Sequence, residues 1–292
     1  MKRRLLSVCL AFIATTAAAQ IQVDLKLKRF QYIAYEPLMV TVSITNLAGR
    51  DVDLRDLAGH AWFGFEIKGK DGETIAPLPS AASQAPLTIA AGKRVTQRVD
   101  LSSFFPMHDF GAYHICAHIY FADLDKFFYS QTKVVEVTGA RPIWQKTVGM
   151  PDAAGGSGSV RTYSLLSNRF VEHTSLYVRV EDRDREIVYA TYSLGRAIAF
   201  GEPQAEIDQA NQLHVLHCAA PRSWTYSTVG LNGQLLAHST FMEAKSRPRL
   251  VHTVEGNVAV HGGMLERPAS ASAARTNASR LSDRPADTPE ED

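Results

Sequence analysis

Two histidines and a cysteine alternate along one short apolar run, at positions 114, 116 and 118 of GAYHICAHIYF (residues 111 to 121). Imidazole nitrogen and thiolate sulfur are ligands that Zn²⁺ prefers, so the spacing suggests a metal site. The flanking isoleucines and aromatic residues favour a strand, in which His114, Cys116 and His118 point to one face. Because a strand rises by about 3.3 Å per residue, His114 and His118 stand about 13 Å apart and cannot share one ion. At most two neighbours could share a metal, with His214 or Cys218 as candidate ligands from elsewhere in the chain.

Those further candidates lie in LHVLHC, residues 213 to 218, where His217 would face away from His214 and Cys218 on a strand. Read instead as a helix, HICAH resembles a zincin motif but carries Ile115 where the general base should be, which excludes a metalloprotease. Two other interpretations remain open. The polar side chains lie on an outward sheet face or at a contact between two domains, or Cys116 forms a disulfide with Cys218.

No common catalytic motif is present elsewhere: the sequence has no GxSxG elbow, no P-loop and no GxGxxG after a strand. The acidic run EDRDRE (residues 181 to 186) is typical of a charged hairpin turn, although glycosidase carboxylates are defined by their separation in space. We therefore predict no catalytic residue and no cofactor. Trp62, Trp144, Trp224 and Tyr226 are candidates for a carbohydrate platform, but the strand contexts of Trp62 and Trp224 favour core positions.

The elements that must position these residues are predicted to be strands. LMVTVSITN (residues 38 to 46) alternates apolar and polar residues, and so does RVTQRVDL (residues 94 to 101). AWFGFEIKG ends in a Lys-Asp-Gly turn, and QTKVVEVTG closes the block. About seven short strands in about 120 residues predict an all-β fold that begins with an immunoglobulin-like sandwich over residues 20 to 138.

The order YEPLMVTVSITNLAGRDVDL, FEIKGKDGE, AAGKRVTQRVDL, GAYHICAHI resembles bacterial Ig-like sandwiches of the BsuPI type, named for an intracellular proteinase inhibitor. The resemblance covers roughly residues 24 to 138 and rests on turn glycines and alternating strands. It implies the fold only, because no inhibitory loop is found to transfer and the chain carries an export signal.

That signal is the N-terminal segment MKRRLLSVCLAFIATTAAAQ, which has a basic start, a short apolar stretch and small residues before Gln20. This pattern predicts a signal peptide over residues 1 to 19, and the apolar stretch is shorter than the ~20 residues that span a bilayer. Cleavage would leave 28 basic and 30 acidic side chains and no transmembrane segment. We expect a periplasmic or extracellular protein, without the basic footprint of a nucleic-acid binder.

The sequence changes character after the first block. Residues 139 to 159 mix prolines with a Gly/Ser cluster and predict a linker. Residues 160 to 264 repeat extended runs that end in glycine turns at spacings near those of propeller blades, which predicts a second antiparallel domain, a meander or small sandwich with blade-like repeats. Residues 265 to 292 have almost nothing apolar to bury and predict a disordered tail.

These features favour a non-enzymatic binding or assembly protein of the bacterial cell envelope, because sandwiches offer sheet edges and loops for interaction and nothing assembles a reacting group. The expected partner is an envelope protein or glycan, not nucleic acid. Two alternatives stay open: a metal-binding protein or hydrolase built on the histidines and cysteines above, and a carbohydrate-binding module.

Overall fold

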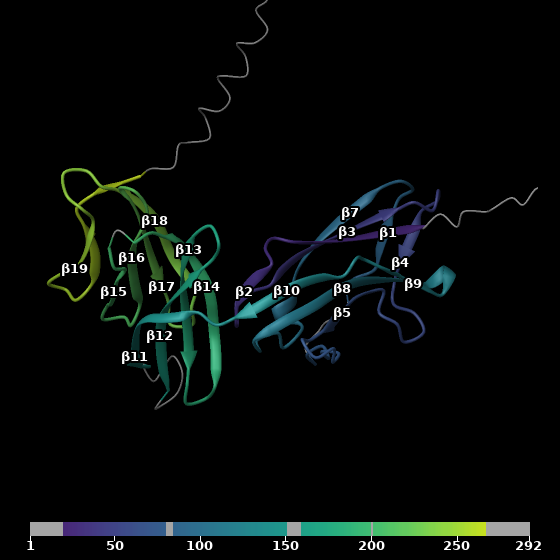
Figure 1. Ribbon diagram of the computed structural model, residues 1–292, viewed down its shortest axis with the longest axis horizontal. Helices are drawn as coiled ribbons and strands as arrows, with labels where there is room; N and C mark the ends of the chain where they lie inside the picture. Colours follow the sequence, from purple (N-terminus) through teal and green to yellow (C-terminus); the bar gives the residue numbers. More distant parts are fainter. Residues whose placement is uncertain (1–19, 80–83, 151–158, 200, 267–292) are drawn as a thin grey trace, which may run out of the picture. The chain divides into compact units, whose positions relative to one another are not determined.

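A computed structural model describes residues 20–79, 84–150, 159–199 and 201–266 of the chain (Figure 1). The predicted signal peptide and nearly all of the predicted tail lie outside these residues. The chain divides after Ala140 into two compact units, unit 1 and unit 2. No helix among the described residues has the length and apolar character needed to cross a membrane.

Unit 1 consists of two principal sheets and a small extra pair of strands. Sheet A has the order β1-β3-β7, and sheet B has the order β2-β10-β8-β5 with β9 also paired to β8. All pairings are antiparallel except that of β2 with β10. The strands are β1 (Ile21–Leu27), β2 (Gln31–Ile33), β3 (Met39–Asn46), β4 (Val52–Leu54), β5 (Phe63–Lys68), β6 (Leu87–Ile89), β7 (Arg94–Asp100), β8 (Gly111–Phe121), β9 (Lys126–Tyr129) and β10 (Lys133–Thr138).

The core of unit 1 lies between sheets A and B and follows from the period-two pattern of the strands. Val40, Val42 and Ile44 of β3 are buried, and Ile115, Ala117 and Ile119 of β8 are also buried. Alternate side chains of a strand face opposite sides, so one face of each sheet packs inward and the other remains outside. The predicted strands over residues 38 to 46, 94 to 101 and 111 to 121 are thereby confirmed.

Unit 2 is built from two consecutive antiparallel meanders. Sheet C has the order β11-β12-β13-β14, sheet D has the order β15-β16-β17-β18-β21, and β19 pairs with β20. The strands are β11 (Arg141–Gly149), β12 (Val160–Arg169), β13 (Thr174–Asp182), β14 (Ile187–Ala197), β15 (Gln204–Ile207), β16 (Leu213–Ala220), β17 (Ser223–Val229), β18 (Leu235–Met242), β19 (Arg249–His252), β20 (Val258–His261) and β21 (Met264–Leu265).

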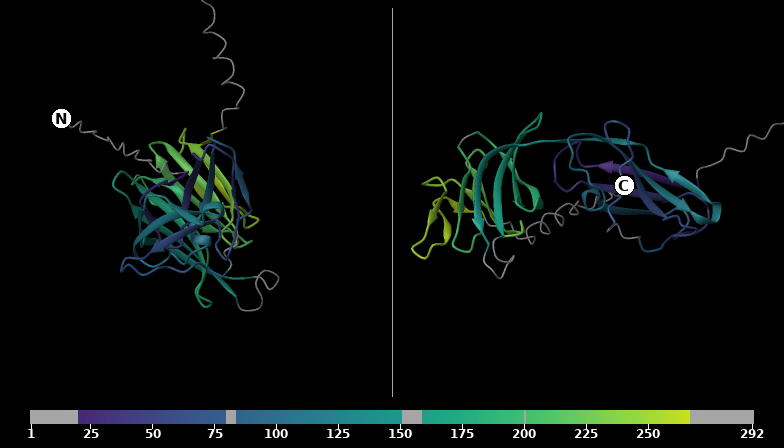
Figure 2. Two further views of the ribbon diagram at one scale, coloured as in Figure 1. Left: turned by 90° about the vertical axis from the view of Figure 1, so that its right-hand side faces the viewer. Right: turned by 90° about the horizontal axis from the view of Figure 1, so that it is seen from below.

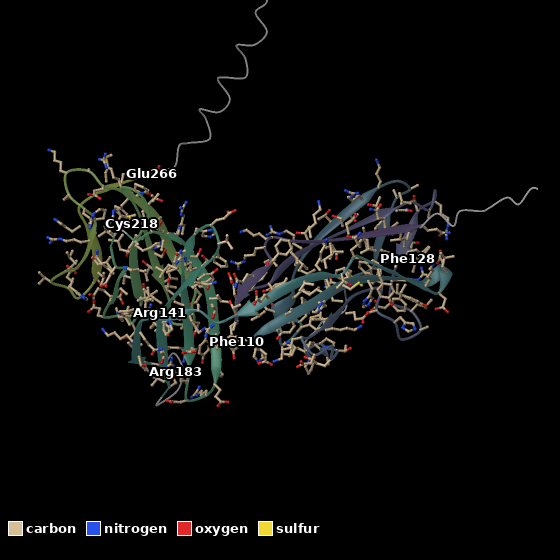
Figure 3. All side chains as sticks on the ribbon, in the orientation of Figure 1. Phe110, Phe128, Arg141, Arg183, Cys218 and Glu266 are labelled. Carbon is tan, nitrogen blue, oxygen red and sulfur yellow. The ribbon has the colours of Figure 1, made fainter. Side chains whose placement is uncertain are left out.

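Sheets C and D pack face to face, and their apposed side chains form a single core that includes Tyr163, Val178 and Val215. A second, smaller cluster on the other face of sheet D contains Leu216 and Trp224 and is covered by the β19–β20 hairpin. Sheet C, sheet D and this hairpin thus follow one another as three layers (Figures 1 and 2). Figure 3 shows the side chains that fill the spaces between them. The predicted second antiparallel domain is confirmed as an all-β unit.

The predicted linker differs from the structure. Residues 141 to 149 form β11, the edge strand of sheet C, which pairs with β12 from Arg141 to Gly149 with one irregularity between Pro142 and Trp144. Its burial pattern is mostly exposed on both faces, with Trp144 and Val148 only partly buried, so it has no clear apolar alternation. Residues 151 to 158 lie outside the described residues. The tail also starts later than predicted, because Leu265 belongs to β21.

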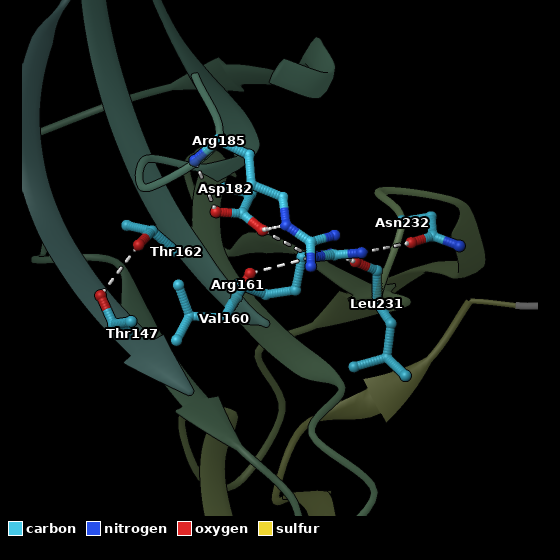
Figure 4. Close-up of polar contacts among 8 residues, drawn as sticks. All are labelled: Thr147, Val160, Arg161, Thr162, Asp182, Arg185, Leu231 and Asn232. Carbon is cyan, nitrogen blue, oxygen red and sulfur yellow. Dashed lines mark hydrogen bonds and ion pairs between the residues drawn. The ribbon is translucent and has the colours of Figure 1, made fainter. Parts of the chain in front are cut away.

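One end of the unit 2 core is closed by a buried ion pair. Arg161 of β12 lies 3.4 Å from Asp182 of β13, and both side chains are almost fully buried (Figure 4). The guanidinium also donates to the carbonyl oxygen of Leu231 at 3.2 Å and to Oδ1 of Asn232 at 3.4 Å, in the turn that joins β17 to β18. The pair therefore fastens the hairpin of sheet D to sheet C. Gly233 in the same turn has φ +80° and lies so close to Ala190 that an added Cβ would stand 2.3 Å from the alanine Cβ.

Candidate functional sites

The alternating histidines and cysteine of β8 point away from the core of unit 1. His114 is exposed, and Cys116 and His118 are half-buried on the outer face of sheet B. The Cys116 thiol is free and donates to the carbonyl oxygen of Ser130 at 3.2 Å. Beside them on β5, Glu66 forms an ion pair of 2.8 Å with Lys68.

His118 is held in place by its neighbours on both sides. It lies opposite Gly64 of β5, where an added Cβ would come within 2.5 Å of the imidazole Nε2, so the missing side chain makes room for the ring. On its other side His118 is paired with Tyr129 of β9. Burial lowers the pKa of His118, against a smaller opposing effect of the Glu66 carboxylate.

The β8–β9 hairpin places aromatic rings beside the His118 imidazole. The β8–β9 connection turns at Asp125, which has φ +49° and whose carboxylate accepts a hydrogen bond of 2.8 Å from Tyr120 Oη. The register sets Tyr120 opposite Phe127 and His118 opposite Tyr129. Directly opposed aromatic side chains in antiparallel strands are favourable pairs.

His60, in a separate loop, contacts the rings of Tyr120 and Phe127. Ala58 and Gly59 have φ of +54° and +82°, and the backbones of Leu57 and His60 exchange two hydrogen bonds, which is the pattern of a tight hairpin turn. The turn sets the His60 ring 4.9 Å from that of Tyr120 and 5.3 Å from that of Phe127, centroid to centroid.

These rings form one continuous surface, which we call the imidazole–aromatic surface. Phe127 links it, with ring centroids 5.0 Å from Tyr120, 5.5 Å from His118 and 6.2 Å from Tyr129. Tyr120 is buried and contacts the rings of His60 and Phe127, while His60 is exposed and Tyr129 is 56% exposed. The surface is thus His60, His118, Tyr120, Phe127 and Tyr129. The imidazole–aromatic surface can contact a ligand through ring faces and can form hydrogen bonds through its imidazoles.

The candidate metal ligands are not assembled into a metal site. Among the residues that the structure describes, no three His, Cys, Asp or Glu side chains are grouped so that they could hold a metal ion. His114, Cys116 and His118 belong to unit 1, and His214 and Cys218 belong to unit 2. The metal site stays a prediction for which the described residues supply no ligand group.

His214 instead belongs to a hydrogen-bonded chain on the face of sheet D toward the β19–β20 hairpin. Its Nε2 lies 3.0 Å from Asp208 Oδ2 and its Nδ1 lies 2.6 Å from Tyr226 Oη, which accepts a further bond from Thr228 at 3.1 Å. Asp208 Oδ1 accepts from the backbone of Ala210 and of Gln212. Every member has partners, so the chain fastens the β15–β16 turn to β17.

Cys218 is buried beside Trp224 in the smaller cluster of unit 2, and burial raises the pKa of its thiol. Both Cys116 and Cys218 are free thiols, each in its own unit, and a disulfide between them stays a prediction.

The tryptophans do not form the proposed carbohydrate platform. Trp62 is fully buried and donates from Nε1 to the carbonyl oxygen of Gln84 at 3.1 Å, and Trp224 is 2% exposed. Trp144 is partly buried against the core between sheets C and D. Tyr226 belongs to the His214 chain. The core positions favoured for Trp62 and Trp224 are confirmed.

Two cavities accompany these features. In unit 1, one of about 370 Å³ lies beside the imidazole–aromatic surface and is lined by His118, Gly64 and several phenylalanines. In unit 2, one of about 400 Å³ has His217 in its lining. The sequence placed His217 on the face away from His214 and Cys218, which the core of unit 2 confirms, but assigned it no role. Its lack of a hydrogen bond of good geometry could not be read from the sequence.

No family model matches the chain, and no curated protein matches it. A solved structure, the sporulation control protein Spo0M from Bacillus subtilis, is similar with 10% identity and a TM-score of 0.29, over 58% of this chain and 83% of that one.

Proposed function

We propose that this chain is an exported, non-catalytic binding protein of the cell envelope that recognises a glycan through the imidazole–aromatic surface of unit 1. The observation that carries the proposal is the convergence of rings from β8, β9 and the loop at residue 60 on one sheet face. Aromatic rings in contact with solvent are enriched where proteins bind partners, because they bury large area at small entropic cost.

A glycan is favoured over a protein partner by the composition of the surface. A sugar ring offers an apolar face for stacking on Phe127 and Tyr129, and hydroxyl groups around its edge. The imidazoles of His60 and His118 and the Glu66–Lys68 pair provide donors and acceptors beside those rings. Carbohydrate binding, which the sequence analysis predicted as an alternative on the tryptophans, is therefore proposed here for a different set of aromatic residues.

We further infer that unit 1 is an immunoglobulin-like sandwich of the BsuPI type. Its strand pairing supports this, because β3 lies between β1 and β7 while β8 lies between β5 and β10, as strands B and F do in such domains. Tyr113 near the start of β8 donates from its hydroxyl to the carbonyl oxygen of Asp109 at 3.0 Å, which is the geometry of a tyrosine corner. Trp62, buried just before β5, occupies the place of the core tryptophan.

The proposal is tested by co-sedimentation of the purified protein with insoluble polysaccharide from the envelope of the source cell. The double variant Phe127→Ala/Tyr129→Ala should weaken binding at least tenfold. Phe30→Ala is the matched control, since Phe30 is an exposed aromatic of unit 1 that is 74% exposed and takes no part in the surface. Binding that is equal in the wild type and the double variant, or absent in the wild type, would contradict the proposal.

A further inference from the structure

The cavity of unit 1 lies at the side of the sandwich where each sheet ends in an edge strand. β5 is the edge strand of sheet B, and β7 is the edge strand of sheet A. Phe63 and Phe65 line the cavity from β5, and Val99 lines it from β7. Phe104 and Phe105, which follow β7, complete its apolar wall. The volume of about 370 Å³ lies within the ~300–1,000 Å³ of small-molecule sites.

The walls of this cavity are hydrophobic and uncharged. Phe63 and Phe105 belong to the core cluster, whereas Phe65, Val99 and Phe104 are only partly buried and pack against it. The rings of Phe63 and Phe65 meet edge to face, with centroids 5.3 Å apart. Among the described residues that line the cavity there is no Asp, Glu, Lys or Arg. The walls therefore favour a neutral, apolar occupant, because its binding would remove the remaining apolar surface from water.

His118 lies at the boundary between this cavity and the imidazole–aromatic surface. It lines the cavity together with Gly64, and its ring centroid is 5.5 Å from that of Phe127 on the surface. Ala61, which follows His60 in the chain, also lines the cavity. The cavity is thus continuous with the surface.

The His118 imidazole has hydrogen-bonding capacity to spare at this boundary. Neither ring nitrogen hydrogen-bonds to a described residue, and neither is sealed from solvent. Because burial lowers its pKa, the ring is neutral at pH 7 and offers one N–H donor and one acceptor nitrogen.

These features together define the occupant as the acyl part of an ester. An acyl chain is neutral and apolar, as the walls require, and its carbonyl oxygen accepts a hydrogen bond from an imidazole N–H. An ester is favoured over an amide because it has no N–H group that would need a further partner beside the apolar wall.

We propose that the cavity of unit 1 binds the ester-linked acyl chain of an acylated glycan, with the carbonyl oxygen hydrogen-bonded to His118 and the sugar on the imidazole–aromatic surface. This inference rests on the function proposed above, and it adds the class of glycan that the site selects.

Monoacylglycerols test the cavity without any sugar. In calorimetric titrations below micelle-forming concentrations, 1-octanoylglycerol should bind one molecule per chain and on the order of 100-fold more tightly than 1-butanoylglycerol, because each of the four added methylenes contributes about fourfold. The ether 1-O-octylglycerol, which lacks the carbonyl, should bind about fivefold more weakly than the ester. In spectra of ¹⁵N-histidine-labelled protein, the His118 resonances should shift with the ester and move less with the ether.

Variants of β7 locate the chain in the cavity. Val99→Phe adds volume inside the cavity and should weaken 1-octanoylglycerol at least tenfold. Val95→Phe is the matched control, because Val95 is also partly buried against the core but does not line the cavity, and it should retain the affinity within about twofold. Equal affinities for the two chain lengths, equal affinities for ester and ether, or equal losses in the two variants would overturn the proposal. The wild-type titrations give the answer even if a variant fails to fold.

Co-sedimentation separates this inference from the function on which it rests. Polysaccharide from the envelope of the source cell should bind at least tenfold more tightly before than after mild alkali removes its ester-linked acyl groups, and Val99→Phe should abolish the difference. Equal binding of the two forms would overturn the inference and leave the glycan surface in place. Failure of both forms to bind, with 1-octanoylglycerol still bound, would contradict the proposed function itself.

Discussion

Buried polar side chains at the two ends of the unit 2 core differ in how completely they are hydrogen-bonded. At one end, Arg161 is fully partnered by Asp182, by the turn at Leu231 and Asn232, and by the Tyr189 ring 3.9 Å from the guanidinium carbon. At the other end, His217 is equally buried and makes no hydrogen bond with any described residue. The first arrangement joins two sheets, and the second leaves an imidazole buried without a hydrogen bond of good geometry. A satisfied network stabilises the fold, whereas a buried polar group without a partner costs free energy of folding.

The largest effect is expected at the partnered end. Asp182→Ala leaves the Arg161 guanidinium buried without its carboxylate, which should lower the free energy of unfolding by about 3 to 5 kcal/mol. Urea denaturation of the purified protein measures this. Asp184→Ala in the same turn is the control, because Asp184 is exposed and its loss should change the free energy by less than about 0.5 kcal/mol. A loss below about 1 kcal/mol for Asp182→Ala would show that the ion pair does not fasten the sheets.

A smaller effect, dependent on pH, is expected at the unpartnered end. The unfolded chain binds a proton at His217 below pH ~6.5, the ordinary value, whereas burial lowers the pKa of His217 in the folded chain to about 4. The unfolded state therefore holds more protons between these values, and the stability contributed by this residue falls as the pH falls through that window. The loss should amount to about 3 kcal/mol, at 1.36 kcal/mol for each unit of pKa difference. Denaturation of the wild type and of His217→Phe between pH 7.5 and 4 should show the variant losing less, and parallel curves would contradict this.

The smallest effect is the stability of His217→Phe at pH 7.5. Removal of an unsatisfied buried imidazole should raise the free energy of unfolding by about 1 kcal/mol, because the cost of desolvating the two nitrogens disappears. The control His261→Phe, at an exposed histidine of the same unit, should lie within about 0.5 kcal/mol of the wild type. Destabilisation of the His217 variant by more than about 1 kcal/mol would mean that the imidazole has a stabilising partner in the free protein.

Sequence reasoning succeeded where one face of a strand is apolar. The alternation in residues 38 to 46 and 111 to 121 predicted the strands, their inward faces and the outward position of His114, Cys116 and His118. It failed for β11, since an edge strand with most side chains exposed carries no such alternation and its proline and glycine residues resemble a linker.

The candidate sites were harder to predict because they depend on contacts across the fold. The imidazole–aromatic surface joins His60 to Phe127, which are far apart in sequence and meet only through a tight turn and a β8–β9 hairpin. Period two correctly placed His217 on the face opposite to His214 and Cys218, without indicating that this face is the inward one. Its lack of partners depends on residues of β12, β13 and β14 that no local pattern identifies.

The central claim, that unit 1 binds a glycan through its imidazole–aromatic surface, is tested most directly by aromatic ¹³C spectra of the labelled protein titrated with soluble fragments of envelope polysaccharide. We expect the ring resonances of Phe127, Tyr129 and His118 to shift together and to saturate with one dissociation constant, while those of Phe30 and of the unit 2 aromatics stay in place. Saturable shifts confined to other rings, or no shift at any soluble concentration of fragments, would contradict it.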